Sequence, residues 1–327
     1  MAENKNDTLL SIKDLKVEYA SGGKIIEAVN GVTLTLSRGA SLGLVGETGA
    51  GKTTIAKAIM RILPDHATRL VEGEITFDGV NILEASDSQL QKIRGGDISM
   101  VFQDPMTALN PIMTVGDQIA EGIALHQHLD KAHAKHEAIR MLETVGISAD
   151  RAGEYPHQFS GGMKQRVVIA IALACSPKLL IADEPTTALD VTIQAQVLDL
   201  IKNLKKAQNT SLLLITHDLG IVADICDQVA VIYAGEIVEW GSLEEIYDHP
   251  THPYTIGLFG AIPDLNSKVR RLSPIEGLPP DPTDLPQGCY FAPRCPHATD
   301  SCRVNHPTLQ HLGGTHYCLC GKINQEG

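Results

Sequence analysis

One eight-residue stretch constrains the fold of this chain more than any other. It fits the pattern G-x-x-x-x-G-K-[ST] and consists of Gly46, Glu47, Thr48, Gly49, Ala50, Gly51, Lys52 and Thr53. An apolar run at residues 40–45 predicts a buried strand before it, and a helical pattern at residues 54–63 follows it. Glycines let a backbone wrap around a polyphosphate, so that N–H groups and a helix N-terminus face its oxygens. The stretch predicts a phosphate-binding loop between a strand and a helix.

Side chains within and beyond this loop point to magnesium-assisted hydrolysis. Lys52 would neutralise the outer phosphates, and the Thr53 hydroxyl would bind Mg²⁺. A buried strand predicted at residues 179–182 leads directly into Asp183 and Glu184. At a strand end, the first acid can hold the water shell of Mg²⁺ and the second can orient or deprotonate the attacking water.

Three further polar residues stand at the ends of predicted strands, and each allows two interpretations. Tyr19 could stack on a nucleobase or be a half-buried strand tyrosine. Gln103 could reach Mg²⁺ or the attacking water, or be a surface amide. His217 could donate to a γ-phosphate or position water, or simply neighbour a helix N-cap.

A second glycine-containing motif suggests a partner subunit. Ser160, Gly161 and Gly162 precede a long helical pattern, which makes them another anion site at a helix N-terminus. One chain needs only one such site per nucleotide, so the second site suggests a partner. Between the two motifs, residues 114–155 carry helical periodicity and predict an inserted helical lobe.

Length and charge limit the class of protein. The 327 residues predict two or three domains, and the formal net charge of −12 argues against a nucleic-acid partner. The N-terminus lacks the apolar core of a signal peptide, and the apolar run at residues 167–175 is too short to cross a bilayer. Work at a membrane would therefore require another chain as anchor.

Taken in order, these motifs resemble those of ABC-transporter nucleotide-binding subunits, with Ala188-Leu189-Asp190 as a further match. The resemblance implies an α/β fold: an ABC-type P-loop ATPase with an antiparallel β lobe and a helical lobe. It would span residues 8–250, with the helical lobe at about 104–168. Phe159 and Met163 depart from the usual signature, and methionine at the latter place is familiar from peptide importers.

The same resemblance assigns roles to the individual residues and implies ATP and Mg²⁺ as cofactors. Tyr19 would stack on adenine, and Gln103 would sense the γ-phosphate. Glu184 would be the general base with His217 as its companion. The implied nucleotide-binding residues are Tyr19, residues 46–53, Thr54, Ser160, Gly161, Gly162 and Asp190, and the implied Mg²⁺ ligands are Thr53, Gln103 and Asp183. Two such subunits would enclose two nucleotides head to tail.

The tail predicts a second, small domain at residues 251–327. His249-Pro250-Thr251-His252-Pro253-Tyr254-Thr255 resembles the junction of oligopeptide and dipeptide importer ATPases, and a proline-rich linker follows at residues 278–286.

Five of the seven cysteines lie in this cysteine-rich C-terminal extension: Cys289, Cys295, Cys302, Cys318 and Cys320. Without a signal peptide they indicate thiols or metal ligands rather than disulfides. Their spacing fits either an iron–sulfur cluster or Zn²⁺. The resemblance implies a [4Fe-4S] cluster and, through His316, makes Cys320 the fourth ligand, with Cys318 as the alternative. Such a cluster would act as a structural staple or as a redox sensor.

These observations lead to one prediction of function and two alternatives. The chain is expected to be the ATPase subunit that powers import of di- and oligopeptides, bound peripherally at the cytoplasmic face of the cell membrane. Its expected partners are a second ABC ATPase, a paralogue, two transmembrane permease subunits and, indirectly, an extracytoplasmic solute-binding protein. One alternative is the same role for nickel, glutathione or another solute. The other is a soluble ABC ATPase that acts on ribosomes or DNA.

Overall fold

A computed structural model of the chain describes residues 7–102, 104–187, 190–261 and 275–322. These residues form two compact units. Unit 1 comprises residues 7–9, 36–41 and 78–215, and unit 2 comprises residues 10–35, 42–77 and 216 onwards. Each unit is an α/β arrangement with its own buried strands.

Unit 1 is built on three parallel strands that carry no exposed residue. β7 (Leu179–Asp183) pairs with β6 (Ile98–Val101) on one side and with β8 (Ser211–Thr216) on the other. Strands buried on both faces read as continuous apolar runs, which is why the sequence predicts them. Outside the helical lobe, the unit also contains β5 (Val80–Asn81), α2 (Asp87–Ile93), α3 (Pro105–Ala108), α6 (Gly161–Leu173) and α7 (Val191–Gln208).

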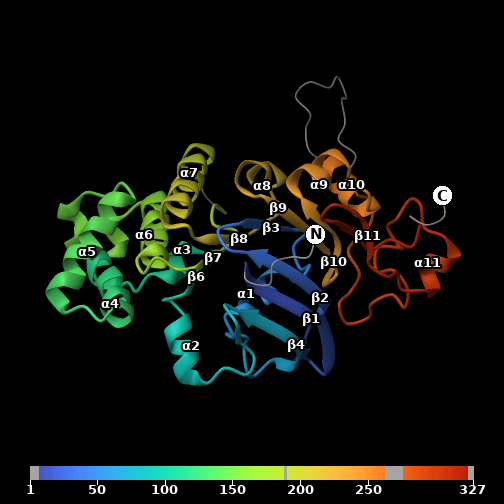
Figure 1. The fold of residues 1–327 in the computed structure, drawn as a ribbon, viewed down its shortest axis with the longest axis horizontal. Coiled ribbons are helices and arrows are strands. Elements are labelled where there is room, and N and C mark those ends of the chain that lie inside the picture. The colour runs from blue at the N-terminus through green and yellow to red at the C-terminus, as the bar shows by residue number, and fades with distance from the viewer. Residues whose placement is uncertain (1–6, 103, 188–189, 262–274, 323–327) are drawn as a thin grey trace. The chain divides into compact units, whose positions relative to one another are not determined.

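The predicted helical lobe is present in unit 1. It contains α4 (Val115–Gln127), α5 (Lys131–Thr144) and the short 3₁₀ helices η1 (Ala149–Gly153) and η2 (Pro156–Gln158), the green part of Figure 1. The Thr114 side chain caps α4 by accepting a hydrogen bond from the Asp117 N–H, and Asp130 caps α5 in the same way. Such caps satisfy N–H groups that have no partner within the helix.

Unit 2 contains the predicted antiparallel β lobe. β1 (Thr8–Ser21) lies between β2 (Lys24–Ser37) and β4 (Thr68–Phe77) in one sheet, and it pairs antiparallel with β4. The register shifts between Lys13 and Lys16, opposite Gly73. At Gly73 a Cβ atom would lie 2.5 Å from the Asp14 carbonyl oxygen, so only glycine fits this bulge.

The second sheet region of unit 2 supports the glycine-rich loop. β3 (Ser41–Val45) pairs parallel with β9 (Gln228–Tyr233), which forms an antiparallel hairpin with β10 (Glu236–Ser242). The helices of this unit are α1 (Lys52–Ile59), α8 (Leu219–Ile225), α9 (Leu243–Asp248), α10 (Pro253–Gly260) and α11 (Asp300–Val304).

The extension contributes two strands that the sequence pattern does not predict. β12 (His316–Cys318) pairs antiparallel with β10, and β11 (Gln310–Gly313) pairs antiparallel with β12. Each is too short to produce a recognisable alternation of apolar and polar residues. The tail is thereby joined to the edge of the β9–β10 hairpin.

Within the described parts of the chain, no helix has both the length and the apolar character that a membrane crossing requires.

Candidate functional site

The glycine-rich stretch forms a loop between β3 and α1, as predicted. Gly51 caps α1 with φ 100°, and a Cβ atom there would lie 2.4 Å from the Ala28 carbonyl oxygen. At Gly46, a Cβ atom would lie 2.2 Å from the Ile232 carbonyl oxygen. Both positions therefore require glycine for conformation or close backbone approach. The loop thus leads into the N-terminus of α1, and a helix N-terminus favours anions.

Lys52 and Tyr19 both lie at this loop. The buried Lys52 ammonium donates to the Gly46 carbonyl at 2.7 Å and to the Glu47 carbonyl at 3.0 Å. Tyr19, half-buried in β1, donates its hydroxyl to Thr54 Oγ1 at 3.4 Å. The structure thus brings Tyr19, Thr54 and the loop together in unit 2.

His217 follows β8 and is exposed. The next residue, Asp218, caps α8 by accepting hydrogen bonds from the N–H groups of Gly220 and Ile221. His217 therefore neighbours a helix N-cap, which was one of its two predicted interpretations, and this position leaves its ring accessible.

In unit 1 the two acidic residues stand at the end of β7, as predicted. Asp183 is the last strand residue and is buried, whereas Glu184 is half-buried. Glu184 has φ 45°, a conformation that is unfavourable by about 1–3 kcal/mol for a non-glycine residue. Its backbone N–H donates to the Ile215 carbonyl, and its carboxylate accepts from the Thr187 hydroxyl at 3.0 Å. These two hydrogen bonds, one from its backbone and one to its side chain, hold Glu184 in this unfavourable backbone conformation.

The Ser160 motif opens α6. The Ser160 hydroxyl caps the helix by accepting from the Met163 N–H. A Cβ atom at Gly162 would lie 2.6 Å from a methyl group of Ile193 in α7, whereas one at Gly161 would meet no atom within 4 Å. Packing within the chain accounts for Gly162 but not for Gly161.

Gln165 connects this helix to the acidic pair, and the sequence analysis missed it. Its side chain is 1% exposed, and its amide donates to the Pro185 carbonyl at 2.6 Å, one residue after Glu184. Asp190 caps α7 by accepting from the Ile193 N–H at 3.0 Å. Gln103 and residues 188–189 lie outside the described residues.

Four of the five cysteines in the extension line one cavity of about 300 Å³: Cys289, Cys295, Cys302 and Cys320. Burial raises the pKa of Cys289 to about 11, and the nearby thiols of Cys302 and Cys320 contribute to the rise. In contrast, a hydrogen bond with the Thr299 hydroxyl at 3.2 Å lowers the pKa of Cys302.

Cys318 does not line this cavity. It is 0% exposed in β12, opposite Glu239 of β10. Among the residues that the structure describes, no group of three or more His, Cys, Asp or Glu side chains is arranged to hold a metal ion.

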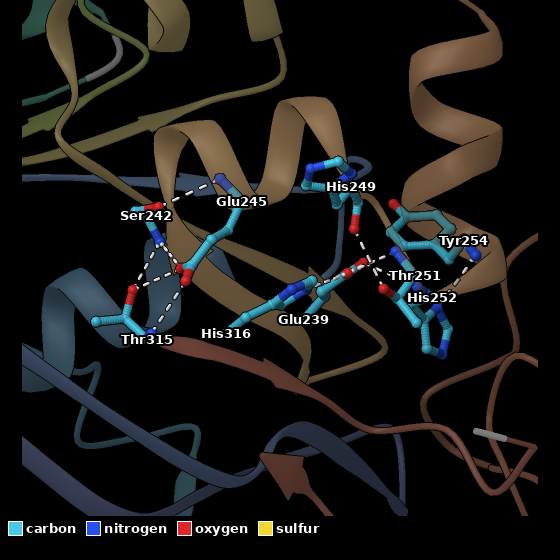
Figure 2. Close-up of polar contacts among 9 residues, drawn as sticks. All are labelled: Glu239, Ser242, Glu245, His249, Thr251, His252, Tyr254, Thr315 and His316. Atoms are coloured by element: carbon cyan, nitrogen blue, oxygen red, sulfur yellow. Dashed lines mark hydrogen bonds and ion pairs between the residues drawn. The ribbon is translucent and has the colours of Figure 1, made fainter. Parts of the chain in front are cut away.

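The segment at residues 249–255, the predicted junction motif, is held by a fully buried carboxylate, Glu239 (Figure 2). It accepts hydrogen bonds from the backbone N–H groups of Thr251 at 2.7 Å and His252 at 2.9 Å, and it pairs with His316 Nε2 at 2.8 Å. Burial lowers the pKa of His252 to about 3, so its neutral ring can accept from the Tyr254 N–H. The residues of the predicted junction motif are thus organised around a residue of β10.

Comparisons with known families and proteins match both parts of the chain. A family described as "ABC transporter" matches residues 29–187, and one described as "Oligopeptide/dipeptide transporter, C-terminal region" matches residues 238–302. The oligopeptide transport ATP-binding protein OppD of Haemophilus influenzae is 50% identical over 298 residues, 90% of this chain and 92% of that protein. The dipeptide transport ATP-binding protein DppD of Bacillus subtilis is 46% identical, over 96% of this chain and 94% of that protein.

Solved structures show the same cassette fold. The ATP-binding cassette MJ0796, in a post-hydrolysis dimer bound to ADP and Pi, has a TM-score of 0.65 at 27% identity and covers 72% of this chain and 99% of its own. CbiO1 from Clostridium perfringens, part of an ABC transporter complex, has a TM-score of 0.63 at 28% identity and covers 74% of this chain and 92% of its own.

Proposed function

The chain belongs to the ATP-binding proteins of ABC-type oligopeptide and dipeptide transporters, and from this premise we propose that it hydrolyses ATP to power import of di- and oligopeptides. The observation that carries the proposal is the presence, in one chain, of a phosphate-binding loop at the start of α1 and of the peptide-transporter C-terminal region. This chain carries out the nucleotide chemistry, whereas peptide transport also requires other subunits.

Within the nucleotide site, residues 46–54 bind the phosphates of ATP through their N–H groups and the Lys52 ammonium. Thr53, Asp183 and Gln103 hold Mg²⁺, and Tyr19 stacks on adenine. The position of the Tyr19 hydroxyl at Thr54, next to the loop, supports the last assignment. Mg²⁺ supplies charge neutralisation for the transferred phosphoryl group.

Glu184 acts as general base, with His217 as its companion and Gln103 as sensor of the γ-phosphate. Support for Glu184 comes from its unfavourable backbone, since such conformations persist where the surrounding structure holds them and concentrate at functional sites. The hydrogen bond from Gln165 to Pro185 couples this region to the Ser160 helix.

Ser160, Gly161, Gly162 and Asp190 face ATP held by a second ATP-binding subunit, which we propose to be a paralogue. The open space at Gly161 supports this, because a glycine without an internal packing reason suits close approach of another molecule. Two permease subunits, and through them an extracytoplasmic solute-binding protein, complete the importer. The chain would then sit at the cytoplasmic face of the membrane, held there by the permeases.

We assign residues 8–250 to the ATPase domain and residues 251–327 to the extension, and within the extension a [4Fe-4S] cluster to Cys289, Cys295, Cys302 and Cys320. Their shared cavity and their free thiols support this set, and Cys320 rather than Cys318 lines that cavity, which supports Cys320 as the fourth ligand. Zn²⁺ bound by the same four thiolates is the alternative. The cluster would staple a segment too small to fold alone.

One experiment tests the transport role. The tagged chain is purified anaerobically from gently solubilised membranes, and every co-purifying protein is identified by mass spectrometry. Two permeases and a second ATP-binding protein are expected. Recovery of ribosomal or DNA-repair proteins without permeases would refute transport while leaving the ATPase chemistry in place.

Glu184→Gln tests the catalytic assignment. It should retain ATP binding, abolish turnover and accumulate a closed dimer on size-exclusion chromatography. Undiminished hydrolysis would remove Glu184 from the role of base.

A further inference from the structure

Arg294 of the extension forms an ion pair with Glu47 of the phosphate-binding loop. The guanidinium of Arg294 forms two hydrogen bonds with the Glu47 carboxylate, Nη1 to Oε2 at 2.7 Å and Nη2 to Oε1 at 3.0 Å. The Arg294 side chain is 5% exposed. Such bidentate pairs combine charge with a fixed geometry, so they orient both partners.

Arg294 is itself held in place by other residues of unit 2. Its Nε donates to the Glu276 carbonyl at 3.1 Å, and its Nη1 donates to the Tyr233 hydroxyl at 3.3 Å. Phe291, three residues before it, packs edge-on against Tyr233 with ring centroids 5.2 Å apart. The guanidinium is therefore presented to the loop in a preset orientation.

Glu47 is fixed at every polar group of its residue. Its backbone N–H donates to the Tyr254 hydroxyl at 3.0 Å, and its carbonyl accepts from Lys52. Tyr254 is 0% exposed and belongs to the junction, whereas Arg294 belongs to the cysteine-rich segment. Two separate parts of the extension thus converge on one residue of the loop.

The negative charge of Glu47 opposes the binding of a polyphosphate, and Arg294 neutralises it. A carboxylate within a loop that binds polyphosphate repels the phosphate oxygens, and this repulsion is strong where water is partly excluded. An arginine paired with it cancels this charge locally, so that the carboxylate no longer opposes the attraction of the anion to the helix N-terminus.

We infer that Arg294 is a positioning residue for the nucleotide site: it orients Glu47 and neutralises its carboxylate, so that the loop accepts polyphosphate. The inference rests on the proposed ATP-binding function and extends it to the C-terminal extension. Arg294 directly precedes Cys295, which lines the four-cysteine cavity. Nucleotide affinity therefore depends on the integrity of the cysteine-rich segment.

The test measures the dissociation constant for MgATP by isothermal titration with four variants of the full chain. Arg294→Gln should raise the constant about tenfold, a typical coupling between sites. Adding Glu47→Gln to this variant should restore most of the affinity, because the unpaired carboxylate is then gone. Arg294→Lys keeps the positive charge but cannot form both hydrogen bonds with the carboxylate, so it should lose less affinity than Arg294→Gln. Arg303→Gln, at an exposed arginine of α11, is the matched control and should bind like wild type.

Each outcome discriminates. If wild type binds MgATP and Arg294→Gln binds equally well, the inference is wrong. If Arg294→Gln loses affinity and Glu47→Gln does not restore it, the arginine is merely structural and the inference is also wrong. Should Arg294→Gln fail to fold, Arg294→Lys with and without Glu47→Gln decides in the same way. If wild type itself does not bind MgATP, the proposed function fails instead.

Discussion

The buried carboxylate of Glu239 should be the residue whose loss most disturbs the docking of the extension. Glu239→Ala removes the acceptor for three donors: two backbone N–H groups, of Thr251 and His252, and His316 Nε2. Each buried donor left without a partner is unfavourable by about 1–3 kcal/mol, and removal of one partner of a buried pair is destabilising by about 3–5 kcal/mol. Because the three donors share one acceptor, their effects do not add. We expect Glu239→Ala to lower the free energy of unfolding by about 3–5 kcal/mol. Glu239→Gln keeps one acceptor oxygen and should lower it by about 2 kcal/mol.

The chain carries its own probe for this measurement. Its single tryptophan, Trp240, follows Glu239 on β10 and stacks on Tyr317 of β12, with ring centroids 5.5 Å apart. Tryptophan fluorescence during urea denaturation therefore reports on β10–β12 pairing, and far-ultraviolet circular dichroism reports on the whole fold. The same substitutions at the exposed Glu244 of α9 serve as controls and should change either signal little. If Glu239→Ala unfolds at the same urea concentration as Glu244→Ala, the network does not stabilise the junction.

Three further predictions concern other parts of the chain. Partial burial raises the pKa of Glu245, but hydrogen bonds from threonine and serine neighbours outweigh this and lower the pKa to about 2, below its ordinary 4.5. A carboxyl group whose pKa is lowered by folding stabilises the fold at pH values above its pKa in the unfolded state. The free energy of unfolding of wild type should therefore exceed that of Glu245→Gln fully at pH 6, and this difference should shrink from about pH 5 towards pH 2 in urea denaturation. A difference that grows on acidification would contradict the assignment. Gly162→Ala should lower the thermal midpoint through its contact with α7, whereas Gly161→Ala should fold normally and reduce the ATPase rate only in the assembled transporter; equal midpoints would show that the packing difference is irrelevant. In anaerobically purified protein, Cys320→Ser should abolish the visible absorbance of the cluster and Cys318→Ser should leave it, and the reverse result would exchange the two ligands.

The linear sequence predicts the nucleotide-binding motifs because each motif consists of residues that are close together in the chain. The glycine pattern of residues 46–53, the acids after the strand at residues 179–182, and the serine and glycines from Ser160 are all local signals. Each keeps its meaning wherever the rest of the chain lies, since a loop before a helix binds phosphate through its own N–H groups. The antiparallel β lobe and the helical lobe could also be predicted, because the alternation of apolar and polar residues in one and the helical periodicity in the other extend over many residues.

Only the tertiary structure decided how the extension meets the ATPase core. The contacts between them join residues that are far apart in the sequence. Glu239 of β10 and His316 of β12 are separated by 77 positions, and Glu47 and Arg294 are separated by 247 positions. A sequence pattern carries no signal for a contact at such separation, since neither partner is unusual in its own neighbourhood. A glutamate in a phosphate loop and an arginine beside a cysteine acquire a joint role only when folding places them within hydrogen-bonding distance. The sequence thus predicts the ligand of the chain, whereas only folding brings Arg294 of the C-terminal segment to Glu47 of the loop.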